Sequence, residues 1–512
     1  MYMSSRTAKS IHNAKIALVF YCINLVLQFF SRKIFLDYLG SEVLGLNTTA
    51  QNLLGFLNIA ELGIGAAVSY NLYKPLFEND WQAINDIVSI QGWLYRRIAW
   101  FVIVSSCVLM CFFPLIFEKA QVPLWYTYGS FIALLVSSLL GYFINYRQIV
   151  LSADQKEYKI TYCVQGIKII KVFLQTLVIW LLSNGYIYWM IVEMAMGVVV
   201  SIVLNKVIKN EYPRLLPTVS KGWELQKLHP EIITKTKQVF FHKIAGFVLL
   251  QTCPLIIYAY ASLTVVAIYG NYMLIIAGIN ALFVALLNSV NAGVGNLVAE
   301  GNKQRIKAVF WELTVFRMWL ASVVCFGIYM LGHSFITLWI GKEYLLPQTP
   351  FILLIFISFI SMTRTNDTFI SAYGLYQDTW APITEALLNL GLSILLGYYY
   401  GLTGILSGIL ISLLVIVCAW KPYFLFSKGF GDRFIEYILH YIKYIGLLFI
   451  SFFTTQVIIW KYLTLSCDTY FRWVEYGIIF ILIYSVISLV LLFSIDKVFR
   501  NFIIHFFKLI KQ

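Results

Sequence analysis

Charged residues are scarce in this sequence. Only 12% of its 512 residues are Asp, Glu, Lys or Arg, whereas 60% are hydrophobic. A soluble domain carries about 25% charged residues, which cover its surface. With half that share the chain cannot be a soluble globular protein. The composition predicts an all-α polytopic membrane protein.

The residues that carry most catalytic and metal chemistry are also few. The eight cysteines form no Cys-x-x-Cys pair, and the six histidines show no pairing at helical spacing. We therefore expect no disulfide framework, no metal site and no cofactor. The sequence lacks a phosphate-binding Gly-Lys-Ser/Thr loop, so ATP is not the direct energy source. Because no Ser/His/Asp or paired-carboxylate arrangement lies at a membrane face, we expect no catalytic residues and no enzyme activity.

Long apolar segments dominate the chain instead. A membrane-spanning helix needs roughly 20 mostly apolar residues. Fourteen segments meet this requirement: 15–37, 43–73, 93–117, 124–150, 160–182, 186–207, 237–260, 264–298, 309–332, 349–374, 380–399, 402–427, 440–462 and 475–495. The second and eighth are long enough to tilt or bend. The first follows a polar, basic start and is predicted to be an uncleaved anchor.

The distribution of Lys and Arg predicts the orientation. With a cytoplasmic N-terminus, about 28 of the 38 basic residues fall on the cytoplasmic side and about six outside. The net charge of +14 therefore reflects membrane topology and does not indicate nucleic-acid binding. Both termini and the longest hydrophilic stretch, 208–236, are predicted to be cytoplasmic. The predicted domains are a six-helix lobe at 1–207, a linker at 208–236, a second six-helix lobe at 237–430, and two extra helices with a basic amphipathic tail at 431–512.

Polar and charged residues recur inside the predicted helices. They are Asn24, Gln28 and Arg32 in the first, Glu61 in the second, Gln165, Lys168, Lys171 and Gln175 in the fifth, Glu193 in the sixth, Arg317 in the ninth, Arg364 and Asp367 in the tenth, and Glu385 in the eleventh. At about 100° per residue, those of the first helix share one face and those of the fifth share another. Such groups avoid lipid because burying a charge in hydrocarbon costs a few kcal/mol.

Two interpretations of these residues stand side by side. One is a hydrated, net positive cavity for an anionic solute, lined by Lys168 and Lys171, which have no compensating acid on their own helix face. The other is structural: interhelical hydrogen bonds, and long basic side chains such as Arg32 that reach the membrane surface. Arg364 and Asp367 lie three residues apart and are expected to form a structural pair.

The segment YLGSEVLGLNTTAQNLLGFLNIAELGIGAAVSYNLYKPLFEND, residues 38–80, resembles the second helix of polysaccharide-biosynthesis flippases. AELGIG followed by YNLYKPL is its most specific part. These proteins are the O-antigen and capsule repeat-unit translocases of the polysaccharide transporter family. They belong to the multidrug/oligosaccharidyl-lipid/polysaccharide exporter superfamily, together with multidrug and toxic compound extrusion (MATE) transporters and lipid II flippases.

The resemblance implies two six-helix lobes around a central cavity, in the cytoplasmic (inner) membrane of a bacterium. It also implies a polyprenyl-pyrophosphate-linked oligosaccharide as substrate, coupling to an ion gradient, and a polysaccharide polymerase and chain-length regulator as partners. Glu61 would be a counter-ion or a protonatable group in the cavity; Asp367, Glu193 and Glu385 are further candidates for ion coupling. The alternative for Glu61 is a simple ion pair with a basic neighbour.

Three other functions are alternatives to a polysaccharide flippase: a lipid II flippase, a MATE-type antiporter, and a glycan polymerase or acyltransferase. Two extra helices after the twelfth resemble the lipid II flippase arrangement. An antiporter of the MATE type would favour an acidic cavity for cationic drugs, whereas the intramembrane excess here is basic. A glycan polymerase or acyltransferase would be expected to have a large outside loop with arginines, which the sequence lacks.

Overall fold

The computed structural model describes residues 6–61, 63–375, 378, 380–462 and 468–510. These residues are almost entirely helical, and no strand occurs among them. The contacts within the chain divide it into two compact units, Met1–Ala267 and Ile268–Gln512, which are described separately. The predicted all-α membrane fold is confirmed.

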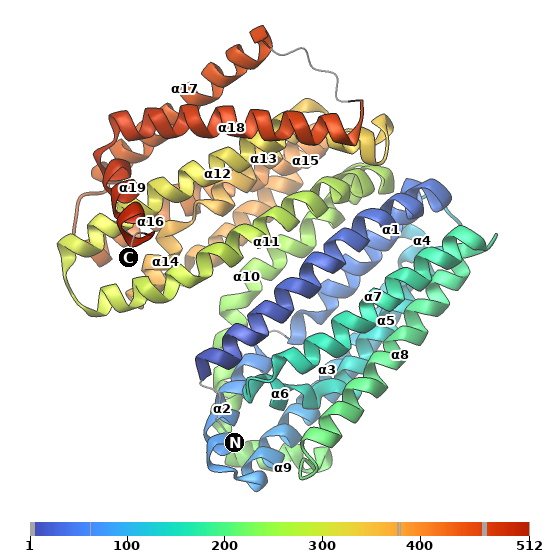
Figure 1. Ribbon diagram of the computed structural model, residues 1–512. Helices are drawn as coiled ribbons and strands as arrows, with labels where there is room; N and C mark the ends of the chain where they lie inside the picture. Colours follow the sequence, from blue (N-terminus) through green and yellow to red (C-terminus); the bar gives the residue numbers. More distant parts are fainter. Residues whose placement is uncertain (1–5, 62, 376–377, 379, 463–467, 511–512) are drawn as a thin grey trace. The chain divides into compact units, whose positions relative to one another are not determined.

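The first unit is a bundle of long helices with short connecting turns (Figure 1). Its elements are α1 (Arg6–Leu57), η1 (Asn58–Glu61), α2 (Ile64–Glu78), α3 (Trp81–Cys111), α4 (Phe113–Ile116), α5 (Leu124–Phe143), η2 (Asn145–Gln148), α6 (Ile149–Ala153), α7 (Glu157–Leu181), α8 (Gly185–Glu211), η3 (Val219–Lys221), α9 (Gly222–Leu228) and α10 (Pro230–Tyr260). Helix α7 packs against both α1 and α8, and α10 packs against α1 and α2. Helix α10 is thus grouped with the first unit by its contacts.

Two glycines with positive φ interrupt the first membrane-spanning segments. Helix α1 is interrupted at Gly40 (φ 79°, ψ 173°), which separates the first two expected spans. The second expected span is itself broken, because η1 replaces the α-helix after Leu57 and Gly63 adopts φ 93° before α2 begins. A residue with a Cβ is disfavoured at such angles, so glycine permits the break. The second expected span, which was long enough to tilt or bend, is thus broken at Gly63.

The second unit is built around α12, the most buried of its membrane-length helices (Figure 1). Its elements after α11 (Leu263–Ala299) are α12 (Lys303–Trp339), η4 (Lys342–Tyr344), α13 (Gln348–Met362), α14 (Thr365–Ala372), α15 (Trp380–Leu413), the π-helical η5 (Leu414–Trp420), α16 (Lys421–Phe424), the π-helical η6 (Leu425–Phe430), α17 (Phe434–Tyr462), α18 (Tyr470–Ile495) and α19 (Lys497–Ile510). Helices α13, α18 and α19 all pack against α12. The tenth expected span is split between α13 and α14.

Helix α15 folds back on itself at Gly401 (φ 56°, ψ −135°). Its two halves approach so closely that a Cβ on Gly404 would lie 1.9 Å from the carbonyl oxygen of Leu396. The Ser393 hydroxyl donates a hydrogen bond across the hairpin to the Ile405 carbonyl, at 3.0 Å. Small residues therefore allow two expected spans, 380–399 and 402–427, to form one tight helical pair.

Eleven helical stretches of the described chain are long and apolar enough to cross a membrane. Two of these, His12–Leu57 and Trp380–Phe430, are 46 and 51 residues long and contain the interruptions at Gly40 and Gly401. Since about 20 residues suffice for one crossing, each accounts for two expected spans. Helix α10, with 31 residues, occupies the position of the expected span 237–260. The fold accommodates about 14 transmembrane helices.

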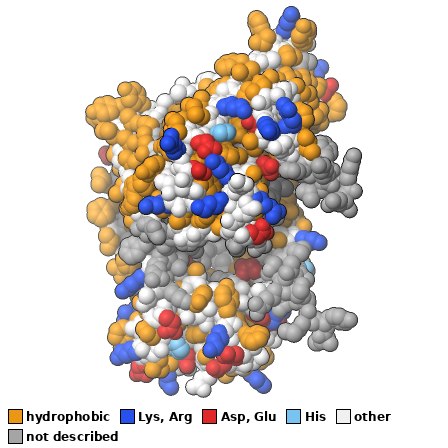
Figure 2. All heavy atoms as spheres, turned by 90° about the vertical axis from the view of Figure 1, so that its left-hand side faces the viewer, with side chains coloured by type: hydrophobic (Ala, Val, Ile, Leu, Met, Phe, Trp, Pro, Cys, Tyr) orange, Lys and Arg blue, Asp and Glu red, His pale blue; other side chains and the backbone are white. Residues whose placement is uncertain are grey.

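Large hydrophobic side chains are exposed on both units, as the bilayer requires. Trp100 of α3 is 63% exposed and Trp460 of α17 is 89% exposed. Figure 2 shows one face, on which Lys, Arg, Asp and Glu side chains gather in patches bordered by hydrophobic ones.

The C-terminal helix α19 packs its Phe499 and Phe502 rings near Trp319 and Phe316 of α12.

Candidate functional site

A polar cluster joins α7 and α8 in the first unit. The Lys171 Nζ atom lies 2.8 Å from Glu193 Oε1, and the Gln175 amide donates to Glu193 Oε2 at 2.8 Å. Glu193 is only 6% exposed, so its charge is satisfied by these two side chains and not by water. The expectation concerned acids on the same helix face as the two lysines; the neighbouring helix α8 supplies Lys171 with its counter-ion.

Lys168 lies one helical turn before Lys171 and differs from it. It is partly buried, and its amine forms no hydrogen bond or ion pair with any residue that the structure describes. Glu193, the carboxylate next to it in space, is occupied by Lys171 and Gln175. Lys168 is thus near Glu193 but has no ion pair of its own in the described chain.

The polar face of α1 packs against the polar face of α7. The Asn24 amide donates to Gln165 Oε1 at 3.3 Å, and Asn24 is only 5% exposed. Gln28 and Arg32 follow at spacings of four residues and are partly buried. Two predicted polar stripes, on α1 and α7, are therefore brought together at the Asn24–Gln165 hydrogen bond. The structure places Arg32 at the end of this row.

Glu61 lies in η1, at the break between α1 and α2. The Tyr95 hydroxyl of α3 donates a hydrogen bond to Glu61 Oε1 at 3.0 Å, and the Tyr142 ring packs edge-on against Tyr95. Among the described residues no Lys, Arg or His lies within ion-pair distance of Glu61. The expected alternative, an ion pair with a basic neighbour, is thus not observed. The Glu61 carboxyl lies instead beside the side chains of Tyr95 and Tyr142.

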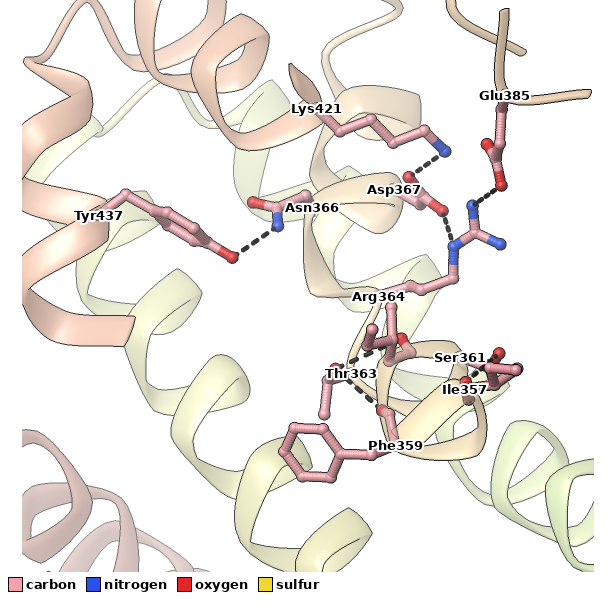
Figure 3. Close-up of polar contacts among 11 residues, drawn as sticks. Ile357, Phe359, Ser361, Thr363, Arg364, Asn366, Asp367, Glu385, Lys421 and Tyr437 are labelled. Carbon is pink, nitrogen blue, oxygen red and sulfur yellow. Dashed lines mark hydrogen bonds and ion pairs between the residues drawn. The ribbon is translucent and has the colours of Figure 1, made fainter. Parts of the chain in front are cut away.

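The second unit holds a four-residue ion-pair network, shown in Figure 3. Arg364, at the start of α14, places Nε 2.8 Å from Asp367 Oδ2, which confirms the expected pair. The other oxygen of Asp367 lies 2.8 Å from Lys421 Nζ of α16. Glu385 of α15 approaches Arg364 Nη2 at 3.7 Å and is 4% exposed. Two cations and two carboxylates therefore balance one another across the break between α13 and α14.

Arg317 of α12 interacts electrostatically with Asp367 of this network but forms no ion pair with it. It is only 6% exposed, and it forms no hydrogen bond or ion pair with a described residue. A buried guanidinium without such partners is costly. Asp367 is thus near three cations, of which Arg364 and Lys421 lie within ion-pair distance.

Two residues of these sites escaped sequence analysis. Lys421 interrupts the apolar run 402–427, and that interruption was the available signal for a buried cation. Its side chain is only 14% exposed. Tyr95 gave no signal, because it is one of 34 tyrosines.

A further charged cluster of the first unit lies where α8 ends and the 208–236 loop begins. Lys156 Nζ lies 2.6 Å from Asp154 Oδ2 and 2.7 Å from Glu211 Oε1, and Lys159 also pairs with Glu211. Burial lowers the pKa of Lys156, but its hydrogen bonds to the two carboxylates outweigh burial and leave that pKa above its ordinary value. The Tyr212 hydroxyl donates to Asp154 at 2.8 Å. The cluster ties the loop to the base of the bundle.

The fold is similar to those of two solved membrane proteins. A solved structure described as "Lipid II flippase MurJ, inward closed conformation" matches with a TM-score of 0.62 and 15% identity, over 92% of this chain and 98% of that chain. An inward-facing multidrug resistance MATE transporter of the MOP superfamily matches with a TM-score of 0.56 and 12% identity, over 85% and 98%. No protein-family model and no curated protein sequence matches the chain.

Proposed function

We propose that this protein is a flippase for polyprenyl-pyrophosphate-linked oligosaccharide repeat units, working by alternating access in a bacterial cytoplasmic membrane. The observation that carries the proposal is Lys168, a partly buried intramembrane cation that no described residue pairs. A pyrophosphate group would supply the missing counter-charge. The fold, shared with a lipid II flippase and a MATE transporter, supports transport as the class of activity.

The surroundings of Lys168 suit a phosphorylated glycolipid. Gln165, one turn before it, presents an amide that can exchange hydrogen bonds with sugar hydroxyls. Lys171 adds a second cation on the same face of α7, against the single carboxylate of Glu193. The surplus of positive charge favours an anionic solute over a cationic one.

Glu61 is proposed as the residue that couples transport to an ion gradient. Its carboxyl lies at a helix break and accepts a hydrogen bond from Tyr95, a neutral donor. Among the described residues no cation holds this carboxyl in an ion pair, so binding of a coupling ion would not have to break one. Asp367 and Glu385 are less suited, because Arg364 and Lys421 hold them in ion pairs.

Two related functions are alternatives. A lipid II flippase is favoured by the structural match, which covers 98% of a chain described as one. A MATE-type antiporter is favoured by the second structural match, but the cation surplus of the first unit argues against a cationic substrate.

Reconstitution into proteoliposomes tests the proposal. The purified chain should move a fluorescent polyprenyl-pyrophosphate oligosaccharide between leaflets, and it should not transport an organic cation such as ethidium. Movement of lipid II but not of longer repeat units would identify the protein as a lipid II flippase. Movement of ethidium alone would overturn the proposal. Fusions at Pro217 and at Gln512 to a reporter that is active only in the cytoplasm test the proposed orientation. Both fusions should be active.

A further inference from the structure

A cation–aromatic cluster covers the loop-side end of α3. The Arg97 guanidinium lies 4.1 Å from the centre of the Trp93 ring and 5.4 Å from that of Trp223, which belongs to α9. Lys227, also of α9, lies 5.6 Å from the Trp223 ring. Such contacts hold each cation against a π-face while leaving its N–H groups available.

The structure fixes this cluster firmly in place. A Cβ on Gly222 would lie 2.3 Å from Cβ of Trp93, so only glycine allows α9 to approach α3 this closely. The loop before α9 is held to α3 by two hydrogen bonds, from the Leu216 amide to Asn85 and from the Thr218 amide to Ser89. The two tryptophans and two cations therefore form a preformed surface.

The position of the cluster along α3 places it at the membrane boundary. Residues 98–117 contain no charged side chain, and these 20 residues separate Arg97 from Glu118. A helix of that length rises about 30 Å, the thickness of the hydrocarbon core. Arg97 thus lies at the level where hydrocarbon gives way to headgroups, and Trp93 lies about 6 Å further out, one turn away.

The face of the cluster is continuous with the face of α3 that meets lipid. Trp100, Val104 and Val108 recur at helical spacing after Arg97 and are 63%, 58% and 55% exposed. Arg97 and Lys227 are exposed, and neither lies within ion-pair distance of a carboxylate in the described chain. Two available cations at the edge of an apolar stripe complement a negatively charged headgroup.

We propose that the Trp93–Arg97–Trp223–Lys227 cluster is a docking site for anionic phospholipid headgroups. In the proposed orientation these belong to the inner leaflet, whose anionic lipids attract basic residues. The tryptophan rings lie at the depth that such rings favour in membranes. The site would hold α9, and with it the 208–236 loop, on the membrane surface. It does not depend on which substrate the protein carries.

Native mass spectrometry of the full-length protein tests the site. The wild-type chain, purified in detergent and supplied with equal phosphatidylglycerol and phosphatidylcholine, should retain phosphatidylglycerol preferentially. Because both cations of the site would contact the bound headgroup through charged hydrogen bonds, the double variant R97Q/K227Q should lower retention roughly tenfold or more. Trp223→Leu, which keeps an apolar side chain but removes the ring, should lower it less.

The matched control is K206Q/K209Q. Lys206 and Lys209 are exposed near the end of α8, and neither is stacked on an aromatic ring in the described structure. This variant removes the same charge and should retain phosphatidylglycerol like the wild type. The proposal is overturned if the wild type shows no preference, if R97Q/K227Q binds like the wild type, or if both double variants lose binding equally. Circular dichroism and gel filtration establish that each variant is folded.

Discussion

Lys171 of α7 and Glu193 of α8 form an intramembrane ion pair of 2.8 Å, and Gln175 completes the coordination of the same carboxylate. The pair joins two helices that are consecutive in the chain. Its neighbour Lys168 has no such partner among the described residues. We therefore expect replacement of Lys171 and replacement of Lys168 to have different effects, although both residues lie on one face of α7.

Replacing Glu193 should destabilise the first unit. Glu193→Gln leaves the Lys171 charge partly buried without its counter-ion, and such a loss costs about 3 kcal/mol in a buried pair, less where water reaches the lysine. The melting temperature in detergent should fall. The double variant Lys171→Met/Glu193→Leu removes both charges and should regain most of the lost stability. If the double variant is less stable than Glu193→Gln, the pair stabilises the fold by more than charge compensation.

Replacing Lys168 should impair transport without impairing folding. Lys168→Gln removes a charge that no described side chain neutralises, so the melting temperature should stay equal or rise. Flipping of the lipid-linked oligosaccharide should fall by about tenfold, because a charged hydrogen bond to a phosphate contributes about 1.5 kcal/mol or more. Lys168→Arg, which keeps the charge, should retain more activity. Unchanged flipping by a well-expressed Lys168→Gln protein would remove this lysine from the substrate path.

Helical spacing was sufficient to predict which polar residues share a face. It placed Gln165, Lys168, Lys171 and Gln175 together, and the structure keeps them on one side of α7. It could not predict that Glu193 lies opposite Lys171, because that depends on how α7 rotates against α8. The partner of a charge is a property of packing between helices, and spacing within one helix does not contain it.

The breaks in the helices were only partly predictable. The length of the second expected span, 43–73, indicated a tilt or a bend, and the chain does break at Gly63. The break between α13 and α14 at Arg364 was not predicted, although the polar stretch TRTNDT, residues 363–368, interrupts the expected span 349–374. The network that stabilises this second break uses Lys421, which lies far along the chain and becomes a neighbour only through the fold.

Removing Asp367 should be more damaging than removing Glu385. Asp367 lies 2.8 Å from each of two cations, whereas Glu385 approaches Arg364 at only 3.7 Å. Asp367→Asn would leave Arg364 and Lys421 facing each other with one weakly placed acid, at a cost of about 3 kcal/mol. Thermal unfolding in detergent should rank the variants as wild type, then Glu385→Gln, then Asp367→Asn. Equal melting temperatures for the two variants would contradict this ranking.

The Lys156 cluster should give an alkaline limit to stability. The folded-state pKa of Lys156 is raised, so its contribution is fully present below the ordinary pKa of 10.5 and is lost as the pH rises through the higher folded value. The difference in melting temperature between the wild type and Lys156→Gln should therefore stay constant from about pH 7 to pH 9 and shrink only above the ordinary lysine range. A difference that disappears near neutral pH would show that the ion pairs do not hold the lysine charged.

Glu61 offers the most direct test of ion coupling. Glu61→Gln retains a carbonyl oxygen in place of Oε1, so the Tyr95 hydroxyl can still donate its hydrogen bond and the break at η1 should persist. The variant cannot take up a proton, so flipping in proteoliposomes should no longer respond to an imposed pH gradient. Tyr95→Phe is the matched control, because it removes the hydrogen bond but keeps the ionisable carboxyl. It should lower the melting temperature by an amount corresponding to about 1 kcal/mol and keep the gradient response. If Glu61→Gln remains gradient-driven while Tyr95→Phe does not, the hydrogen bond and not the proton is what transport requires.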